Sequence, residues 1–215
     1  MLHGFGKGGM VRQVKHRATE TLSAELEGCG SVLVLASSFG STGAEVCTDL
    51  LAGDEPGETT VLAVTYRQSA REWVERWYDH TVHPPKRGIV VGVGDGTAAD
   101  LDGLDVHGAG RWSAESVDNP ADLTGLGIRL SDHLDSADGP VRFCFDSLTA
   151  LLQYTDVKPA FQFCHALTGR VKGADAVGHY HLDPAAHDDR TLATIMGLFD
   201  ASIEYGDDEW TVRTR

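Results

Sequence analysis

The chain has 215 residues, of which 41% are hydrophobic and 23% charged, as is typical of one globular domain rather than a disordered segment. Its 18 lysines and arginines face 32 aspartates and glutamates, which gives a formal net charge of -14. So acidic a chain is not expected to bind nucleic acid nonspecifically, because such binding needs cations that displace phosphate counterions.

An acidic surplus with few lysines is typical of cytoplasmic proteins from salt-accumulating organisms, in which salt screens the repulsion between surface charges. An ordinary, mildly acidic protein is the alternative. No apolar run is long enough for a membrane span, and no signal peptide is evident. The four cysteines form no CxxC pair, and Cys47 and Cys144 lie in apolar segments as small core residues do. We therefore expect a cytoplasmic protein with reduced thiols.

The first element of the chain is basic. Its four cations, without any acidic residue, are Lys7, Arg12, Lys15 and Arg17. We interpret this segment as a solvated arm, with contact to an acidic partner or DNA as the alternative. The pattern of Val14–Glu27 predicts a helix that ends at Gly28. Residues 1–27 would thus form a basic arm and a leading helix, followed by a single domain of residues 28–215.

Short apolar runs without alternation then predict strands buried on both faces, and helical periodicity predicts helices between them. The predicted strands are Ser31–Ser37, Thr59–Thr65, Gly88–Val93, Val141–Phe145, Ala174–Leu182, Ala201–Tyr205 and Trp210–Arg213. The predicted helices are Gly43–Leu51, Ala70–Tyr78, Asp122–Leu134, Thr149–Tyr154, Pro159–Lys172 and Asp188–Phe199. This alternation predicts an α/β fold, with a mostly parallel sheet, helices on both faces and an antiparallel C-terminal hairpin at the edge.

In such sheets ligands bind beyond the carboxyl ends of the strands. Five segments follow strands and are candidates for a site: Ser37–Gly43, Tyr66–Gln68, Gly94–Gly96, Asp146–Ser147 and His179–Asp183.

The first of these segments has the strand, glycine loop and helix of a phosphate-binding P-loop. A P-loop has glycine, four residues, glycine, lysine and then serine or threonine. If Gly43 is the second glycine, Ser38 stands at the place of the first. The lysine place then holds Ala44, and the magnesium-binding hydroxyl place holds Glu45. Backbone N–H groups of the loop can still hold an anion, but the charge clamp for phosphate is missing.

The run VRFCFDSLTALL at Val141–Leu152 resembles the Walker-B region of RecA-type ATPases, in particular the KaiC-like branch, in which an apolar strand ends in Asp-Ser. Three more segments resemble that branch in the same order: Asp122–Leu134, Leu167–Leu182 and Phe199–Tyr205. The resemblance covers roughly residues 28–215. The chain is also similar to haloarchaeal relatives of that branch in which the Walker-A loop is degenerate.

The resemblance implies a RecA-like sheet and a vestigial nucleotide site formed by Ser38, Phe39, Gly40, Ser41, Thr42, Gly43, Asp146 and Ser147. In the family, the aspartate at the place of Asp146 orders magnesium, and acids after the second strand activate water. Here that second place reads Tyr66, Arg67, Gln68. We therefore expect no efficient ATP hydrolysis, no catalytic residue and no cofactor beyond residual ATP and magnesium.

Histidines gather near the end of another predicted strand. His179, His181 and Asp183 alternate, and His187 follows. On a strand such residues face one side, and imidazole with carboxylate is suited to zinc. No second group of ligands at matching spacing accompanies them. We interpret these four residues as polar strand-end residues, with a metal site as the alternative.

Two tryptophans lie four residues apart on a predicted helix, Trp73 and Trp77, and Tyr78 follows. Such a stripe is usually part of the core, and a partner-binding surface is the alternative.

The sequence therefore favours a non-hydrolysing RecA/KaiC-like regulatory or scaffold protein that acts through protein partners or as a homo-oligomer. Two alternatives stay open: a nucleotide-binding switch that uses Asp146, and a metal-dependent hydrolase built on the histidine cluster. Only the switch predicts stabilisation by ATP, and only the hydrolase predicts bound zinc. Neither nucleic acid nor a membrane is expected as a partner.

Overall fold

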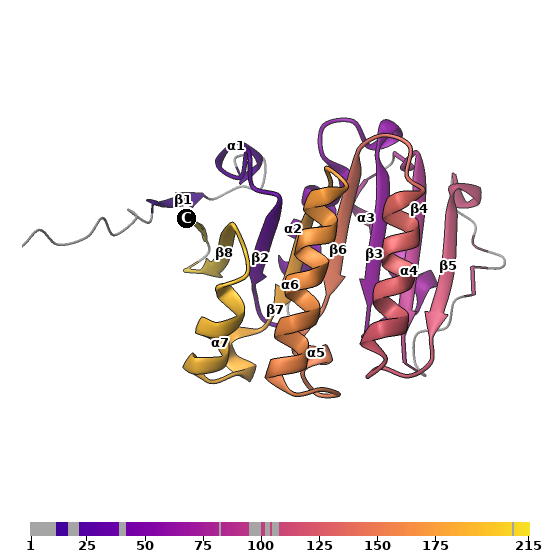
Figure 1. Ribbon diagram of the computed structural model, residues 1–215. Coiled ribbons are helices and arrows are strands. Elements are labelled where there is room, and N and C mark those ends of the chain that lie inside the picture. Colours follow the sequence, from indigo (N-terminus) through magenta and orange to yellow (C-terminus); the bar gives the residue numbers. More distant parts are fainter. Residues whose placement is uncertain are drawn as a thin grey trace, which may run out of the picture.

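The computed structural model describes residues 12–16, 22–38, 42–81, 83–94, 100–101, 104, 108–207 and 209–215. In these residues nine strands form one sheet in the order β1-β9-β8-β2-β7-β6-β3-β4-β5 (Figure 1). The strands are β1 (Arg12–His16), β2 (Ser31–Leu35), β3 (Thr60–Thr65), β4 (Arg87–Val93), β5 (Trp112–Val117), β6 (Val141–Asp146), β7 (Val177–Leu182), β8 (Ala201–Gly206) and β9 (Glu209–Thr214).

Helices connect most of the strands. They are α1 (Leu22–Glu25), α2 (Thr42–Ala52), α3 (Ala70–His80), α4 (Leu123–Asp135), α5 (Leu148–Leu151), α6 (Val157–Gly173) and α7 (Asp189–Met196). Three short 3-10 helices are η2 (Pro56–Glu58), η3 (Ala109–Arg111) and η4 (Pro184–Ala186). None of the helices in the described residues combines the length and the apolar character needed to cross a bilayer.

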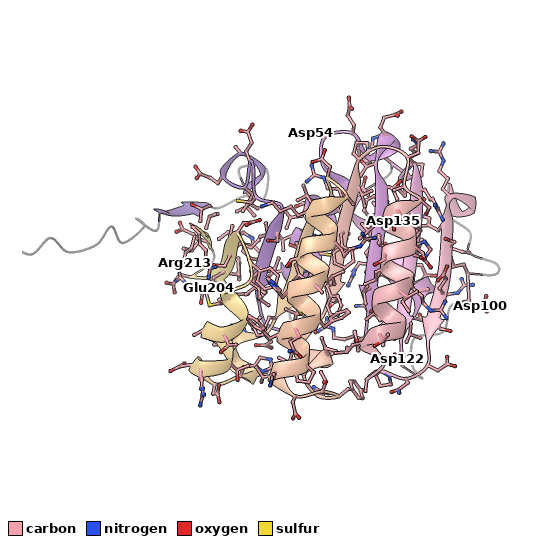
Figure 2. The ribbon with its side chains drawn as sticks, viewed as in Figure 1. Asp54, Asp100, Asp122, Asp135, Glu204 and Arg213 are labelled. Atoms are coloured by element: carbon pink, nitrogen blue, oxygen red, sulfur yellow. The ribbon has the colours of Figure 1, made fainter. Side chains whose placement is uncertain are left out.

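The strands from β8 to β5 in the sheet order run parallel, and β9 pairs antiparallel with β8. This confirms the predicted α/β class with its C-terminal antiparallel hairpin. On the hairpin, Arg213 Nη2 lies 3.0 Å from Glu204 Oε2, and both side chains are at the surface (Figure 2).

Helices cover both faces of the sheet (Figure 1). On one face, Leu130 of α4 and Leu167 of α6 pack with Phe143 and Phe145 of β6 in the largest buried cluster. On the other face, α2 and α3 pack against the sheet, and Trp73 of α3 belongs to a second buried cluster there. The carboxyl ends of the parallel strands are thus flanked by α2 and α3 on one side and by α5 on the other.

The predicted helix Val14–Glu27 is wrong over its first residues, because Arg12–His16 form β1 and only Leu22–Glu25 are helical among the described residues. β1 pairs antiparallel with β9, with Val14 opposite Val212. An unpaired β9 would leave a row of N–H and C=O groups open, and β1 pairs with them. A short isolated helix has little stability in water, so residues 12–16 are more stable as a strand paired with β9. Lys7 and Arg17 of the predicted basic arm lie outside the described residues.

Strand β5 is absent from the sequence prediction, which has an acidic loop there. Only its end residues, Trp112 and Val117, are buried, and the residues between them are half-buried or exposed. An edge strand that pairs with one neighbour does not need a continuous apolar run, so the search for apolar runs did not predict β5. Glu115 of β5 contacts Arg129 and His133 of α4 at 3.3 and 3.2 Å.

Candidate functional site

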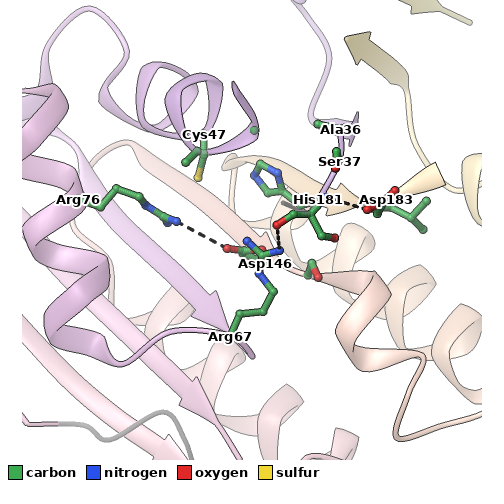
Figure 3. Close-up of a pocket in the computed structure, with 13 residues that line it drawn as sticks. Ala36, Ser37, Cys47, Arg67, Arg76, Asp146, His181 and Asp183 are labelled. Carbon is green, nitrogen blue, oxygen red and sulfur yellow. Dashed lines mark hydrogen bonds and ion pairs between the residues drawn. The ribbon is translucent and has the colours of Figure 1, made fainter. Parts of the chain in front are cut away.

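A small cavity lies where β2, β6 and β7 end (Figure 3). Its lining residues come from the segment after β2, the start of α2, the segment after β3, helix α3 and the ends of β6 and β7. Its volume in the described residues is about 30 Å³. That holds roughly two water molecules and is far below the several hundred Å³ of a typical ligand pocket.

Asp146 is the acidic residue of this cavity. It ends β6, opposite Thr65 of β3, so Arg67, the second residue after β3, reaches its carboxylate. Arg67 places its Nε 3.5 Å from Oδ1 of Asp146, and Arg76 of α3 places Nη1 3.9 Å from Oδ2 (Figure 3). The Asp146 side chain is 8% exposed, so two guanidinium groups balance a nearly buried carboxylate.

Arg67 also holds the loop after β2, because its Nη1 donates to the carbonyl oxygen of Ser38 at 2.9 Å. The loop is held a second time by Asp183, whose carboxylate accepts hydrogen bonds from Ser38 N–H at 2.8 Å and Ala185 N–H at 3.0 Å. Burial acts to raise the pKa of Asp183, but these hydrogen bonds outweigh it and the pKa lies below its usual value. The Asp183 carboxylate therefore acts as a hydrogen-bond acceptor for backbone N–H groups, including that of Ser38 in the loop after β2.

The predicted nucleotide site is assembled only in part. Ser38, Gly43, Asp146 and Ser147 line the cavity, whereas Thr42 begins α2 without lining it. Phe39, Gly40 and Ser41 lie outside the described residues. The Ser147 hydroxyl accepts from Ala150 N–H at 3.3 Å and caps α5.

The two P-loop substitutions differ in their placement. Ala44 lines the cavity, whereas Glu45 is exposed on α2 and does not line it. Glu45 therefore opposes an anion in the cavity less directly than the sequence implied.

The predicted histidine cluster separates into two parts. His187 places Nε2 3.1 Å from Thr149 Oγ1, which in turn accepts from Asp183 N–H at 2.8 Å. His179 and His181 instead face α2, with ring centroids 5.1 Å apart. The four predicted candidates thus do not converge on one point.

His179 and His181 meet two cysteines instead. Cys47 Sγ lies 3.2 Å from Cys144 Sγ and 3.2 Å from His179 Nε2. The hydrogen bond from Cys144, together with both histidines, holds the pKa of Cys47 well below its ordinary value despite burial. Burial lowers the pKa of His179, which favours the neutral imidazole.

Several other residues that the sequence singled out lie away from the cavity. Trp73 and Trp77 are 2% and 1% exposed and pack on Trp112 at centroid distances of 5.5 and 5.6 Å, so the core interpretation is confirmed. Tyr66 packs on Phe145 at 5.7 Å, away from the cavity. In the segment after β4, Gly94 does not line the cavity and residues 95–96 lie outside the described residues.

The sequence reasoning noted Arg67 only as a departure from the family and did not identify Arg76. Arg67 could have been identified from the sequence, because it is a cation two residues after a strand, where the RecA/KaiC-like proteins that the sequence resembles have an acid. Arg76 gave no such signal, since it lies in mid-helix and reaches Asp146 only because α3 packs over the sheet.

Three comparisons relate the chain to known proteins. Residues 29–205 match the sequence model of a family of unknown function, DUF7504. No curated protein matches the chain significantly. A solved structure from Pyrococcus horikoshii OT3, from a structural study of a numbered project protein, is similar with a TM-score of 0.56 and 14% identity over 88% of each chain. At that identity the likeness shows the fold alone.

Proposed function

The chain belongs to the DUF7504 family of unknown function, and we propose that it is a non-hydrolysing regulatory or scaffold protein with a degenerate RecA/KaiC-like P-loop fold. In this proposal it acts in the cytoplasm through protein partners or further copies of itself. Four free cysteines fit a reducing compartment.

The observation that carries the proposal is the pairing of Asp146 with Arg67 and Arg76. In a working P-loop site, the corresponding aspartate orders magnesium, and the magnesium and lysine neutralise phosphate. Here two guanidinium groups already balance the carboxylate, and a divalent cation beside them would meet like charge. The chain therefore keeps the aspartate as part of an internal ion-pair network.

Three further observations support the absence of turnover. Ala44, at the lysine place, lines the cavity without a charge to offer a phosphate. Arg67 follows β3 where the family has an acid that activates water, so a cation stands at the place of the base. The cavity that the described residues form holds only about 30 Å³, which is less than a nucleotide occupies.

The test is thermal unfolding in multimolar KCl with and without millimolar Mg-ATP. We expect no change in melting temperature and no phosphate release. A ligand that binds only the folded state at about a hundredfold its dissociation constant would stabilise it by about 2.7 kcal/mol, which is readily measured.

The matched variant is Asp146→Asn, which keeps the shape of the side chain and removes its charge. A rise in melting temperature with ATP in the wild type that disappears in Asp146→Asn would overturn the scaffold proposal in favour of the nucleotide switch. Phosphate release by the wild type above that of the variant would show an enzyme.

A further inference from the structure

Two strands bring a cysteine and two histidines to one face of the sheet. Cys144 of β6 is directly opposite His179 in the register with β7. Because side chains alternate along a strand, His181 faces the same side as His179. The intervening Tyr180 packs in the cluster on the opposite face.

Helix α2 brings the fourth residue over this face. Cys47 lies one turn into α2, and its neighbour Val46 is fully buried, so the helix is pressed against the sheet at this point. Cys47 Sγ then lies 3.2 Å from both Cys144 Sγ and His179 Nε2. One ligand atom from each of Cys47, Cys144, His179 and His181 lies within 4.8 Å of all the others.

Three residues of the group are buried, His181 is partly buried, and one polar atom of the group has no partner among the described residues. Cys47, Cys144 and His179 are 2%, 0% and 3% exposed. His181 Nε2 is buried and makes no hydrogen bond with the described residues. A buried imidazole nitrogen without a partner costs free energy, and a metal ion at the centre of the group would supply the missing interaction.

We propose that Cys47, Cys144, His179 and His181 bind one Zn²⁺ ion. Two thiolates and two imidazoles form a Cys₂His₂ set, which is a common donor set of structural zinc. Tetrahedral bonds of ~2.3 Å to sulfur and ~2.0 Å to nitrogen place the ligand atoms ~3.3–3.8 Å from one another. The observed 3.2 Å between Cys47 Sγ and His179 Nε2 is ~0.3 Å short of that geometry, and the 3.2 Å between the two sulfurs is ~0.6 Å short of it. All four ligand atoms already lie within 4.8 Å of one another, so small side-chain movements bring them to tetrahedral positions.

Charge and coordination number determine the role of the ion. Two thiolates neutralise Zn²⁺, so the complete site carries no net charge, as a buried position requires. Four protein ligands close the coordination sphere, which makes the ion structural rather than catalytic. This site differs from the histidine cluster that the sequence left open as an alternative metal site, because Cys47 and Cys144 replace Asp183 and His187.

The proposed ligands lie on α2, β6 and β7, so the ion would connect these three elements. Cys47 and His181 also line the cavity that contains Asp146. Helix α2 begins at Thr42, directly after the loop that Arg67 and Asp183 hold. Zinc would tie α2 to β6 and β7 below that loop and would stabilise the fold whether or not a nucleotide binds.

The first experiment uses wild-type protein purified without chelator or added metal. We expect one equivalent of zinc by mass spectrometry of the metal content, and a lower melting temperature after removal of the ion with a chelator. Exchange for Co²⁺ should give visible absorption of tetrahedral cobalt and thiolate-to-cobalt charge transfer in the near ultraviolet. Metal-free wild type whose melting temperature does not respond to added Zn²⁺ would overturn the proposal.

Matched variants locate the ligands. His181→Gln and Cys47→Ser should lose the zinc and the cobalt spectrum, whereas His187→Gln and Cys29→Ser should keep both. Far-ultraviolet circular dichroism checks that each variant is folded. If the ligand variants do not fold, the measurements on the wild type decide alone. Zinc retained by a folded His181→Gln variant at one equivalent would contradict the assignment.

A disulfide between Cys47 and Cys144 is the competing outcome. Denaturation without reductant, followed by alkylation and mass measurement, should label all four cysteines if they are thiols. Labelling of only Cys29 and Cys164 would show the disulfide and exclude the zinc site. These readouts do not involve ATP, so this inference and the scaffold proposal can fail separately.

Discussion

At the scale of single residues, Asp146 illustrates how neighbours decide the role of a side chain. It is the last residue of β6, at the carboxyl edge of the sheet. Arg67 and Arg76 make it one member of an ion-pair network, and Arg76 also lies 5.5 Å from the centre of the Trp73 ring. Its carboxylate is therefore engaged by side chains of the protein itself.

Asp183 carries a prediction on pH dependence. Because hydrogen bonds to its carboxylate depress its pKa in the folded state, it stabilises the fold above the unfolded value of about 4. This contribution is lost as the pH falls through the depressed pKa of the folded state. We expect Asp183→Asn to lower the free energy of unfolding by about 2 kcal/mol at pH 7, from two hydrogen bonds to a charged acceptor.

The measurement is urea unfolding of wild type and Asp183→Asn at pH 7 and at about pH 3. The gap between the two proteins should shrink at the lower pH, since the wild-type carboxyl begins to protonate there. The control Asp54→Asn changes an exposed side chain that projects from the surface (Figure 2) and should have little effect at pH 7. A gap that grows on acidification would contradict the assigned role.

At the scale of elements, the pairing of β4 and β5 depends on a glycine. Gly88 of β4 is opposite Trp112 of β5, and a Cβ atom added at Gly88 would run into the indole ring. Trp112 is 6% exposed and packs on Trp73 and Trp77, so its ring has no free space to move into. The cluster thus requires a residue without a side chain on the neighbouring strand.

We therefore expect Gly88→Ala to destabilise the protein by about 3 kcal/mol, at the upper end of overpacking costs. Gly110→Ala is the matched control, because nothing lies within 4 Å of a Cβ atom there. Chemical denaturation followed by tryptophan fluorescence reports on both stability and the indole cluster. Equal stabilities of the two variants would show that the sheet relaxes around the added methyl group.

At the scale of the whole molecule, the net charge of -14 predicts a response to salt. Acidic side chains such as Asp54 and Asp100 project from the surface (Figure 2). The Debye length falls from about 10 Å at 0.1 M salt to about 3 Å at 1 M, so repulsion among such groups is screened. We expect the melting temperature to rise steadily from 0.1 M to multimolar KCl.

Scans in KCl and in sucrose separate screening from a general exclusion effect. Sucrose stabilises folded proteins by being excluded from their surface and leaves the charges unscreened. A rise with KCl that levels off once the charges are screened supports the electrostatic cause. A melting temperature that is independent of KCl would count against adaptation to high salt.

Much of the fold was predictable from sequence because its signals are local. The parallel strands β2, β3, β4 and β6 are mostly apolar runs, and β7 alternates histidines with apolar residues. Each of these strands was predicted within a few residues of its bounds. β1 and β5 were missed because edge strands are held by backbone pairing with a neighbour, which leaves little trace in the pattern of side chains.

The candidate site was predictable only as a set of strand ends. The sequence placed Ser38, Asp146 and His181 at the same edge of the sheet, and all three line one cavity. It did not separate His181 from His187, because spacing along the chain does not tell which way each residue turns after the strand ends. The contribution of Arg76 was likewise hidden, since it depends on the packing of α3.

The sequence by itself determined the α/β class, the acid surplus and the uncharged Ala44 after the loop that follows β2, because each is a property of residue type and local order. Only the tertiary structure decided that Cys47 lies beside Cys144, 97 positions away, and beside His179, 132 positions away. It also decided that two arginines converge on Asp146. The physical reason is that strand register and the packing of a helix on a sheet arise from the whole core at once, and no local segment encodes them.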